Sequence, residues 1–106
     1  MSRDYHKALG GEVAPVSDDP VIRAYREQIA GVDRGILDAL NERIRLVERL
    51  KEHKEERGLG FRDPAQEERL LAALRQANRG PLSEQGLREI FGLILEWTKR
   101  DAAGQG

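Results

Sequence analysis

The chain has 106 residues, of which 39% are hydrophobic, 35% charged and only 5% aromatic, with 18 Lys and Arg against 19 Asp and Glu. This balance is typical of one domain built from helices that bury a single stripe, and it disfavours an all-β fold. The charges alternate in sign along the chain, and no segment is long and apolar enough to cross a membrane, so neither a nucleic-acid surface nor a membrane span is expected.

Residues 1–19 mix Gly, Pro, Ser and Asp without periodicity, which predicts a flexible N-terminal leader. The chain has no cysteine and no apolar run typical of a signal peptide, so we expect a protein of the reducing cytoplasm. Its histidines are His6 and His53 alone. Such a sparse set of ligands predicts no metal site, and no cofactor is expected.

A very long first helix is predicted from Pro20 to about Arg57. Asp18 or Asp19 provides the N-cap, Pro20 occupies the first helical position, and Gly58 ends the helix. At 1.5 Å per residue, its length would be about 55 Å. Its apolar residues recur at helical spacing and form one stripe: Ile22, Tyr25, Ile29, Val32, Ile36, Leu40, Val47 and Leu50.

A second, shorter helix is predicted to begin after Asp63, which caps it, with Pro64 at the first position. Gln66 completes a capping-box pattern in which its amide reaches back toward the cap. Gly80-Pro81 ends the segment. The buried side of this helix is expected to consist of Leu70, Leu71 and Leu74.

The third helix is predicted to start after Ser83 as N-cap, with Leu82 placed to contact Leu87, and to continue to about Arg100. Its apolar face comprises Leu87, Ile90, Phe91, Ile94, Leu95 and Trp97. Residues 103–106 are expected to fray.

The predicted domain, residues 20–102, is therefore all-α, with one very long helix and two short ones. Two helices of about 15 residues cover the stripe of the long helix only in part, and a domain of about 80 residues has a marginal core. Pairing of two long helices would bury the stripe. We therefore expect an intertwined homodimer with six helices.

Three cations interrupt the apolar pattern of the first helix, namely Arg26, Arg43 and Lys54. A buried cation is costly unless it meets an anion, so the three indicate a site for a small, multiply charged acid. Arg43 and Lys54 lie about three turns apart, roughly 16 Å along one face, and can reach the two ends of one ligand. Arg26 is about 25 Å before Arg43 and off that face, so it is expected to serve the pocket of the other subunit.

These residues occur in an order that resembles the all-helical (type II) chorismate mutase family over roughly residues 21–102. Each motif is common by itself, but the order Arg, Arg, Lys, Asp-Pro-x-x-Glu with these gaps is specific. The matching segments are Tyr25-Arg26-Glu27-Gln28-Ile29, Val32-Asp33, Leu40-Asn41-Glu42-Arg43, Lys54, Phe61-Arg62-Asp63-Pro64-Ala65-Gln66-Glu67, Gly80-Pro81-Leu82-Ser83 and Ile90-Phe91.

The resemblance implies the concerted [3,3] rearrangement of chorismate to prephenate, an isomerase reaction of phenylalanine and tyrosine biosynthesis. It implies that Arg43 and the other subunit's Arg26 bind the two carboxylates and that Lys54 donates to the ether oxygen. Glu67, with the backbone around Asp63, would hold the ring hydroxyl. Position 66 also lies in the substrate-binding motif, and Thr98 would contact a carboxylate.

The chain departs from the family pattern in two places. Gln66 stands where the motif usually has Arg, and Ala102 stands where the third helix usually offers Gln or Glu to the ether oxygen. Gln105 follows three residues later and would replace that donor only if the third helix extends so far. Two alternatives therefore stay open. One is a related enzyme, an isochorismate pyruvate-lyase or a 4-amino-4-deoxychorismate mutase. The other is a weakly active or non-catalytic helical dimer that needs a partner enzyme of the shikimate pathway.

Each site residue also has a purely structural explanation. Asp63 can be only a helix cap, and a helical Thr98 often bonds to the preceding turn. The stem of Arg43 can lie along the apolar stripe with its head in water. Lys54 and Glu67 can be solvated charges beside a loop. The joint spacing of these residues favours the functional interpretation.

Overall fold

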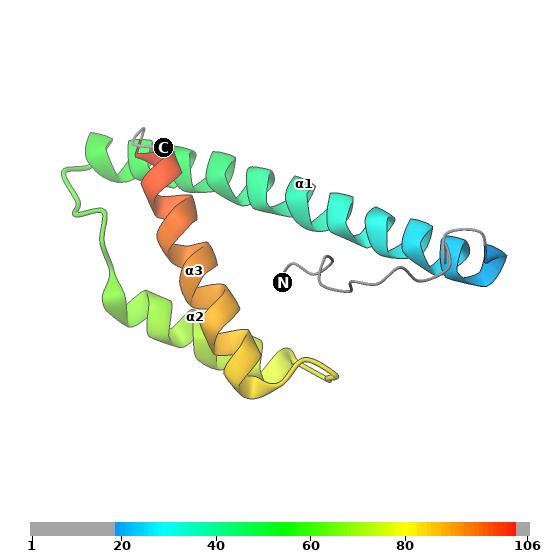
Figure 1. Cartoon of the computed structure of the whole chain (residues 1–106). Coiled ribbons are helices and arrows are strands. Elements are labelled where there is room, and N and C mark those ends of the chain that lie inside the picture. The colour runs from blue at the N-terminus through cyan, green and yellow to red at the C-terminus, as the bar shows by residue number, and fades with distance from the viewer. Residues whose placement is uncertain (1–18, 104–106) are drawn as a thin grey trace, which may run out of the picture. The chain divides into compact units, whose positions relative to one another are not determined.

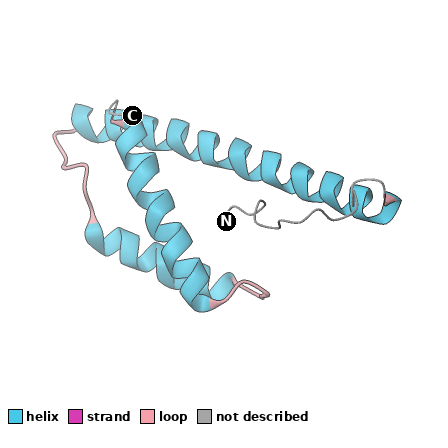
Figure 2. Cartoon of the chain, viewed as in Figure 1, coloured by secondary structure: helices cyan, strands magenta, loops and turns pink. Residues whose placement is uncertain are grey.

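The computed structural model describes residues 19–103, and in that range the chain is made of helices and loops without a strand. The helices are α1 (Pro20–Glu56), α2 (Pro64–Ala77) and α3 (Glu84–Ala102) (Figures 1 and 2). The predicted all-α class, with one long and two short helices, is confirmed. Most of the predicted leader, including His6, and also Gln105, lie outside the described residues.

The described chain divides into two units, with the boundary inside α1 between Ile36 and Leu37. The first unit contains the N-terminal part of α1. The second contains the rest of α1 together with α2 and α3. None of the helices in the described part has an apolar stretch that could cross a bilayer.

The start of α1 is capped as its sequence predicts. Asp19 Oδ1 accepts hydrogen bonds from the backbone N–H groups of Val21 (2.8 Å) and Ile22 (3.4 Å). Pro20 follows as the first helical residue. An N–H at this position has no acceptor within the helix, so its absence in proline costs no hydrogen bond. Asp19 is therefore the N-cap.

The end of α1 follows from one glycine. Gly58 has a φ of 70°, and its N–H donates to the carbonyl of Glu55 (3.1 Å) while that of Leu59 donates to the carbonyl of Lys54 (2.8 Å). These two bonds form a Schellman motif, which needs one residue in the left-handed conformation. Glycine adopts that conformation without strain. The helix ends at Glu56, one residue before the predicted end.

The N-terminus of α2 confirms the cap but corrects the predicted capping box. Asp63 Oδ1 accepts from the backbone N–H of Gln66 (3.2 Å), as an N-cap should. The side chain of Gln66 does not reach back to Asp63. Its Oε1 instead accepts from Nε (3.2 Å) and Nη2 (2.9 Å) of Arg69, because a guanidinium one turn further along the helix is a stronger donor than a backbone amide.

The connection between α2 and α3 starts earlier than predicted. Asn78 is extended (φ −73°, ψ 121°), so α2 ends at Ala77 and not at Gly80-Pro81. The Asn78 side chain closes the turn, accepting from the N–H of Gly80 and donating to the carbonyl of Leu82, both at 2.9 Å. An asparagine side chain that hydrogen-bonds the backbone of a turn stabilises the turn at the expense of a longer helix. This effect was missed in the prediction.

Helix α3 begins with the predicted cap and ends later than predicted. The hydroxyl of Ser83 accepts from the N–H of Gly86 (3.0 Å). The helix runs to Ala102, two residues beyond Arg100. Together α2 and α3 form a helical hairpin (Figure 1), whose buried residues are Leu87, Leu95 and Thr98.

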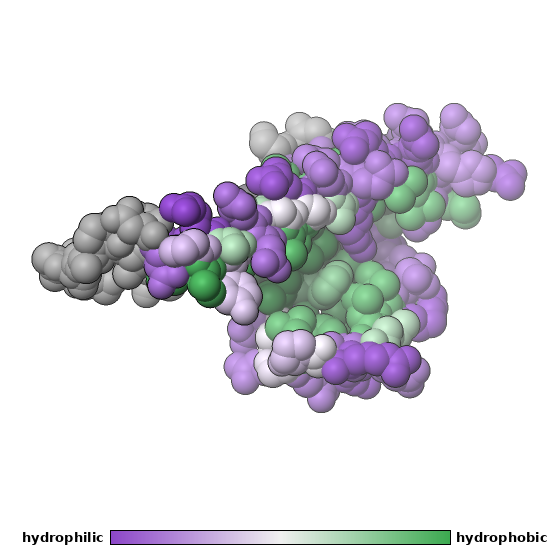
Figure 3. Space-filling model, turned by 90° about the vertical axis from the view of Figure 1, so that its right-hand side faces the viewer, coloured by the Kyte–Doolittle hydropathy of each residue, from purple (hydrophilic) through white to green (hydrophobic). Residues whose placement is uncertain are grey.

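The apolar stripe of α1 is not covered within one chain, since no residue of this helix is buried. In the first unit Tyr25, Ile29, Val32 and Ile36 are each more than half exposed (62%, 58%, 63% and 52%). A space-filling view shows hydrophobic side chains open to the surface (Figure 3). Large apolar side chains exposed at helical spacing are typical of protein–protein interaction surfaces.

Candidate active site

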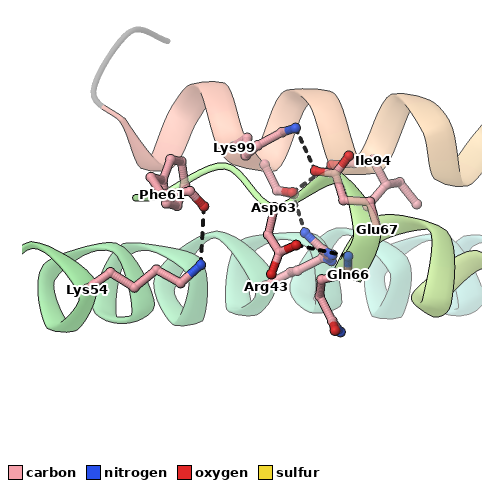
Figure 4. Close-up of polar contacts among 9 residues, drawn as sticks. Arg43, Lys54, Phe61, Asp63, Gln66, Glu67, Ile94 and Lys99 are labelled. Atoms are coloured by element: carbon pink, nitrogen blue, oxygen red, sulfur yellow. Dashed lines mark hydrogen bonds and ion pairs between the residues drawn. The ribbon is translucent and has the colours of Figure 1, made fainter. Parts of the chain in front are cut away.

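Arg43 is tied to α3 by a short hydrogen bond. Its Nη1 donates to the hydroxyl of Thr98 at 2.6 Å, and that hydroxyl donates to the carbonyl of Ile94, also at 2.6 Å (Figure 4). Thr98 is 2% exposed, and Arg43 is half-buried. Because the only hydroxyl proton of Thr98 is engaged, its role in this arrangement is to hold the guanidinium of Arg43.

Lys54 lies in the last turn of α1, where a cation is favoured by the helix dipole. Its ammonium donates to the carbonyl of Phe61 at 3.2 Å, which ties the loop before α2 to the end of α1 (Figure 4). The loop continues to Asp63, the cap of α2. Lys54 therefore contacts the backbone that leads into the Asp-Pro-x-x-Glu motif.

Glu67 has a partner that the sequence analysis missed. Its Oε2 accepts from the ammonium of Lys99 at 2.6 Å, and the two side chains are 34% and 20% exposed (Figure 4). Both residues line a cavity of about 800 Å³ along α2 and α3. Arg43, Lys54 and Thr98 are not among the residues that line this cavity. The carboxylate of Glu67 is thus turned toward α3.

The side chains of two predicted site residues, Gln66 and Arg26, form no hydrogen bond or ion pair with this group among residues 19–103. The side chain of Gln66 is exposed, bonds Arg69 and points away from the pair of Glu67 and Lys99 (Figure 4). Arg26 belongs to the first unit and is exposed, with no hydrogen bond or ion pair to another described residue. The second unit therefore contains Arg43, Lys54, Thr98 and the Asp63 motif, whereas Arg26 belongs to the first unit.

Two further residues of α3 were missed in the sequence analysis. Lys99 lies 32 residues from its partner Glu67, and the sequence pattern within one helix cannot predict a contact over that separation. Asp101 Oδ1 is buried and has no hydrogen-bond partner within the described chain. It follows Thr98 by about one helical turn, so the spacing alone indicated that it shares the inward face.

The cations retain donors for a ligand. A guanidinium carries five N–H donors and an ammonium three, and within residues 19–103 Arg43 and Lys54 each use one. No group of three or more His, Asp or Glu in the same range is arranged to hold a metal ion. The described part of the chain is thus an all-helical protein in which two half-buried cations of α1 keep unused donors.

Comparison with known proteins identifies the family of this helical protein. The family model described as chorismate mutase type II matches residues 25–102. The solved structure of chorismate mutase (Form II) from Thermus thermophilus is similar to this chain, with 36% sequence identity, a TM-score of 0.74, and coverage of 79% of this chain and 96% of that one. The search of curated proteins gave no match.

The chain belongs to the chorismate mutase type II family, since the matched segment spans most of its length. It is accordingly an enzyme of the isomerase class, with the chorismate mutase activity of its family. The resemblance drawn from the order of Arg26, Arg43, Lys54, Asp63 and Glu67 is confirmed.

Proposed function

We propose that residues 20–102 rearrange chorismate to prephenate, without a cofactor, at a site built around Arg43 and Lys54. The observation that carries the proposal is that these two half-buried cations lie on one face of α1 and keep unused donors. Their spacing along the helix, roughly 16 Å, suits two side chains that converge on one dicarboxylate from its ends. A rearrangement with no covalent intermediate needs only orientation and charge stabilisation.

Arg43 binds a carboxylate of the substrate in this proposal. Its bond to Thr98 supports the assignment, because a guanidinium held by a buried hydroxyl loses little further freedom when a ligand arrives. Thr98 takes part in substrate binding through Arg43. Lys54 donates to the ether oxygen, on which negative charge grows as the C–O bond breaks, and this contact strengthens in the transition state.

Glu67 accepts a hydrogen bond from the ring hydroxyl, together with the backbone around Asp63. The position of Asp63 as N-cap of α2 supports this, because it orients the loop that Lys54 also binds. Gln66 lies in the substrate-binding motif by sequence. Because its amide is bonded to Arg69, a contact with the substrate requires that side chain to turn.

Arg26 of a second copy completes the site in an intertwined homodimer. The exposed stripe of Tyr25, Ile29, Val32 and Ile36 supports this assembly, since burying such side chains stabilises the pair by about 1–2 kcal/mol each. Arg26 lies next to Tyr25 in that segment, so covering the stripe brings Arg26 to the partner. Dimerisation and completion of the site are then one event.

The neutral amide of Gln66 and the missing donor at Ala102 favour a second candidate for the same scaffold. It is a lyase acting on isochorismate or a mutase acting on 4-amino-4-deoxychorismate, because both positions would face the ring substituent or the ether in the proposed site. Low intrinsic activity that rises with a shikimate-pathway partner enzyme in the cytoplasm is the third possibility.

One assay separates these candidates. The purified chain is incubated with chorismate, and in parallel with isochorismate and 4-amino-4-deoxychorismate, and the products are identified by chromatography. Prephenate from chorismate at an enzymatic rate supports the mutase. Pyruvate from isochorismate, or turnover of the amino substrate alone, supports the second candidate. No turnover of any substrate contradicts the proposal, and a rate that rises only when the first shikimate-pathway enzyme is added supports the third.

A further inference from the structure

We propose that Lys99 is a positioning residue of this active site, holding the carboxylate of Glu67 and balancing its charge where the substrate binds. The proposal rests on the function proposed above, in which Glu67 accepts the ring hydroxyl. Lys99 Nζ lies 2.6 Å from Glu67 Oε2 and comes from the other helix of the hairpin, so the pair joins α2 to α3. It engages one oxygen of Glu67 and leaves the other free for a ligand.

The chemistry of the ligand explains why this charge matters. Chorismate is a dianion, so a carboxylate near it is repulsive unless a cation balances it. Glu67 is 34% exposed, which leaves its charge only partly screened by water. An ammonium at 2.6 Å compensates that charge while Arg43 and Lys54 stay available to the substrate.

No other described cation near Glu67 balances its charge. Position 66, where the family motif usually has Arg, holds a neutral Gln whose side chain points away from Glu67 (Figure 4). Arg100 also lines the cavity, but it pairs with Glu96 at 3.0 Å and its guanidinium lies 4.8 Å from the ring centroid of Trp97. Lys99 is thus the cation bonded to Glu67 within residues 19–103.

The alternative is that the pair only stabilises the hairpin. A part-exposed ion pair of this kind contributes little to stability, and a purely structural role predicts a lower melting temperature with unchanged kinetics. A positioning role predicts a change in KM. Because Glu67 would contact the hydroxyl both before and during the rearrangement, its loss of alignment should weaken binding more than it slows turnover.

The test measures kcat and KM for chorismate, with thermal unfolding, in Lys99→Met, Lys99→Arg, Glu67→Gln and the double variant Glu67→Gln/Lys99→Met. Lys51→Met is the matched control, because Lys51 forms a 2.9 Å ion pair with Glu55 on α1, away from Glu67. Lys99→Met is expected to raise KM about 10-fold or more, with kcat lowered less than about threefold. Lys99→Arg, which keeps the charge, should return KM to within about threefold of the unaltered chain.

The double variant decides whether Lys99 acts through Glu67. In the Glu67→Gln background, Lys99→Met should change KM less than about threefold, because a neutral amide needs no balancing charge. Full additivity of the two substitutions overturns the proposal. So does a KM for Lys99→Met within about twofold of that for Lys51→Met.

Two results keep the test unambiguous. If Lys99→Met does not fold, Lys99→Gln is judged by the same criteria, because it retains a polar side chain without the charge. An unaltered chain that turns over chorismate while Lys99→Met shows a normal KM contradicts the role of Lys99 alone. An unaltered chain with no turnover of chorismate contradicts the proposed function and the role of Lys99 with it.

Discussion

Arg43 on α1 donates to Thr98 on α3 over 2.6 Å, and the two residues are 55 positions apart in the sequence. The same hydroxyl donates to the carbonyl of Ile94, so both of its hydrogen-bonding functions are used. Thr98 therefore holds the guanidinium of Arg43, the group that binds a substrate carboxylate in the proposed function, without needing to touch the substrate itself.

Thr98→Val should lower kcat/KM about 10-fold, because it leaves the guanidinium of Arg43 without its buried acceptor. The free energy of unfolding should fall by about 1 kcal/mol. Steady-state kinetics and thermal unfolding measure the two effects. Thr98→Ser keeps the hydroxyl and serves as the control. Equal kcat/KM for the Val and Ser variants would show that Thr98 does not position Arg43.

Lys54→Ala should lower kcat by about 10²-fold or more and change KM by less, since its contact with the ether oxygen strengthens as charge develops. The Phe61 carbonyl also loses its donor, so folding is checked by circular dichroism. Lys51→Met again controls for the loss of a lysine from α1. A KM increase with an unchanged kcat would remove Lys54 from the chemical step and leave it as a binding residue.

Mixing two inactive chains tests the shared site. Arg26→Ala and Arg43→Ala homodimers should each be nearly inactive. After subunit exchange at equal amounts, about half of the dimers are mixed and each contains one site with neither substitution, so about a quarter of the unaltered activity should return. The activity is measured before and after exchange by mild denaturation and refolding. No recovery, despite mixed dimers detected by mass spectrometry, would contradict the contribution of Arg26 from a second subunit.

Gln66→Ala should leave kcat/KM within about threefold of the unaltered chain. The side chain is exposed and its amide oxygen is bonded to Arg69, so its truncation removes only a surface hydrogen bond. The measurement is the same chorismate assay, with Glu67→Gln as the comparison. A loss above about 10-fold would mean that Gln66 turns to contact the substrate, as its place in the motif implies.

Asp101→Ala should raise the free energy of unfolding by about 1 kcal/mol. Asp101 Oδ1 is buried without a donor among the described residues, and its carboxylate lies near the C-terminus of α3, where the helix dipole disfavours an anion. Asp101→Asn, which removes the charge and keeps the oxygen, should recover only part of the gain. Chemical denaturation of both variants measures the change. A clear loss of stability in both would mean that Asp101 accepts a hydrogen bond from a second subunit.

Local sequence was sufficient to predict where the helices begin. Asp19, Asp63 and Ser83 each bond a backbone N–H two or three residues further along, and Gly58 ends α1 through its positive φ. These features depend on neighbours within one turn, which a sequence displays directly. The early end of α2 was missed because the side chain of Asn78 forms its own turn.

Residue spacing alone was enough to predict the helical class, the family and the placement of Arg43 and Lys54 on one face of α1. It did so because helical periodicity and motif spacing are properties of residues close together in the chain. The folded chain was needed to show that Thr98 holds Arg43, that Glu67 pairs with Lys99, and that Gln66 turns outward to Arg69. The first two contacts join residues 55 and 32 positions apart, so the first forms only when α3 lies beside α1 and the second only when α2 and α3 pair. In the third contact, the side chain of Gln66 could bond either the backbone of Asp63 or the guanidinium of Arg69. It bonds Arg69, because the charged guanidinium is the stronger donor.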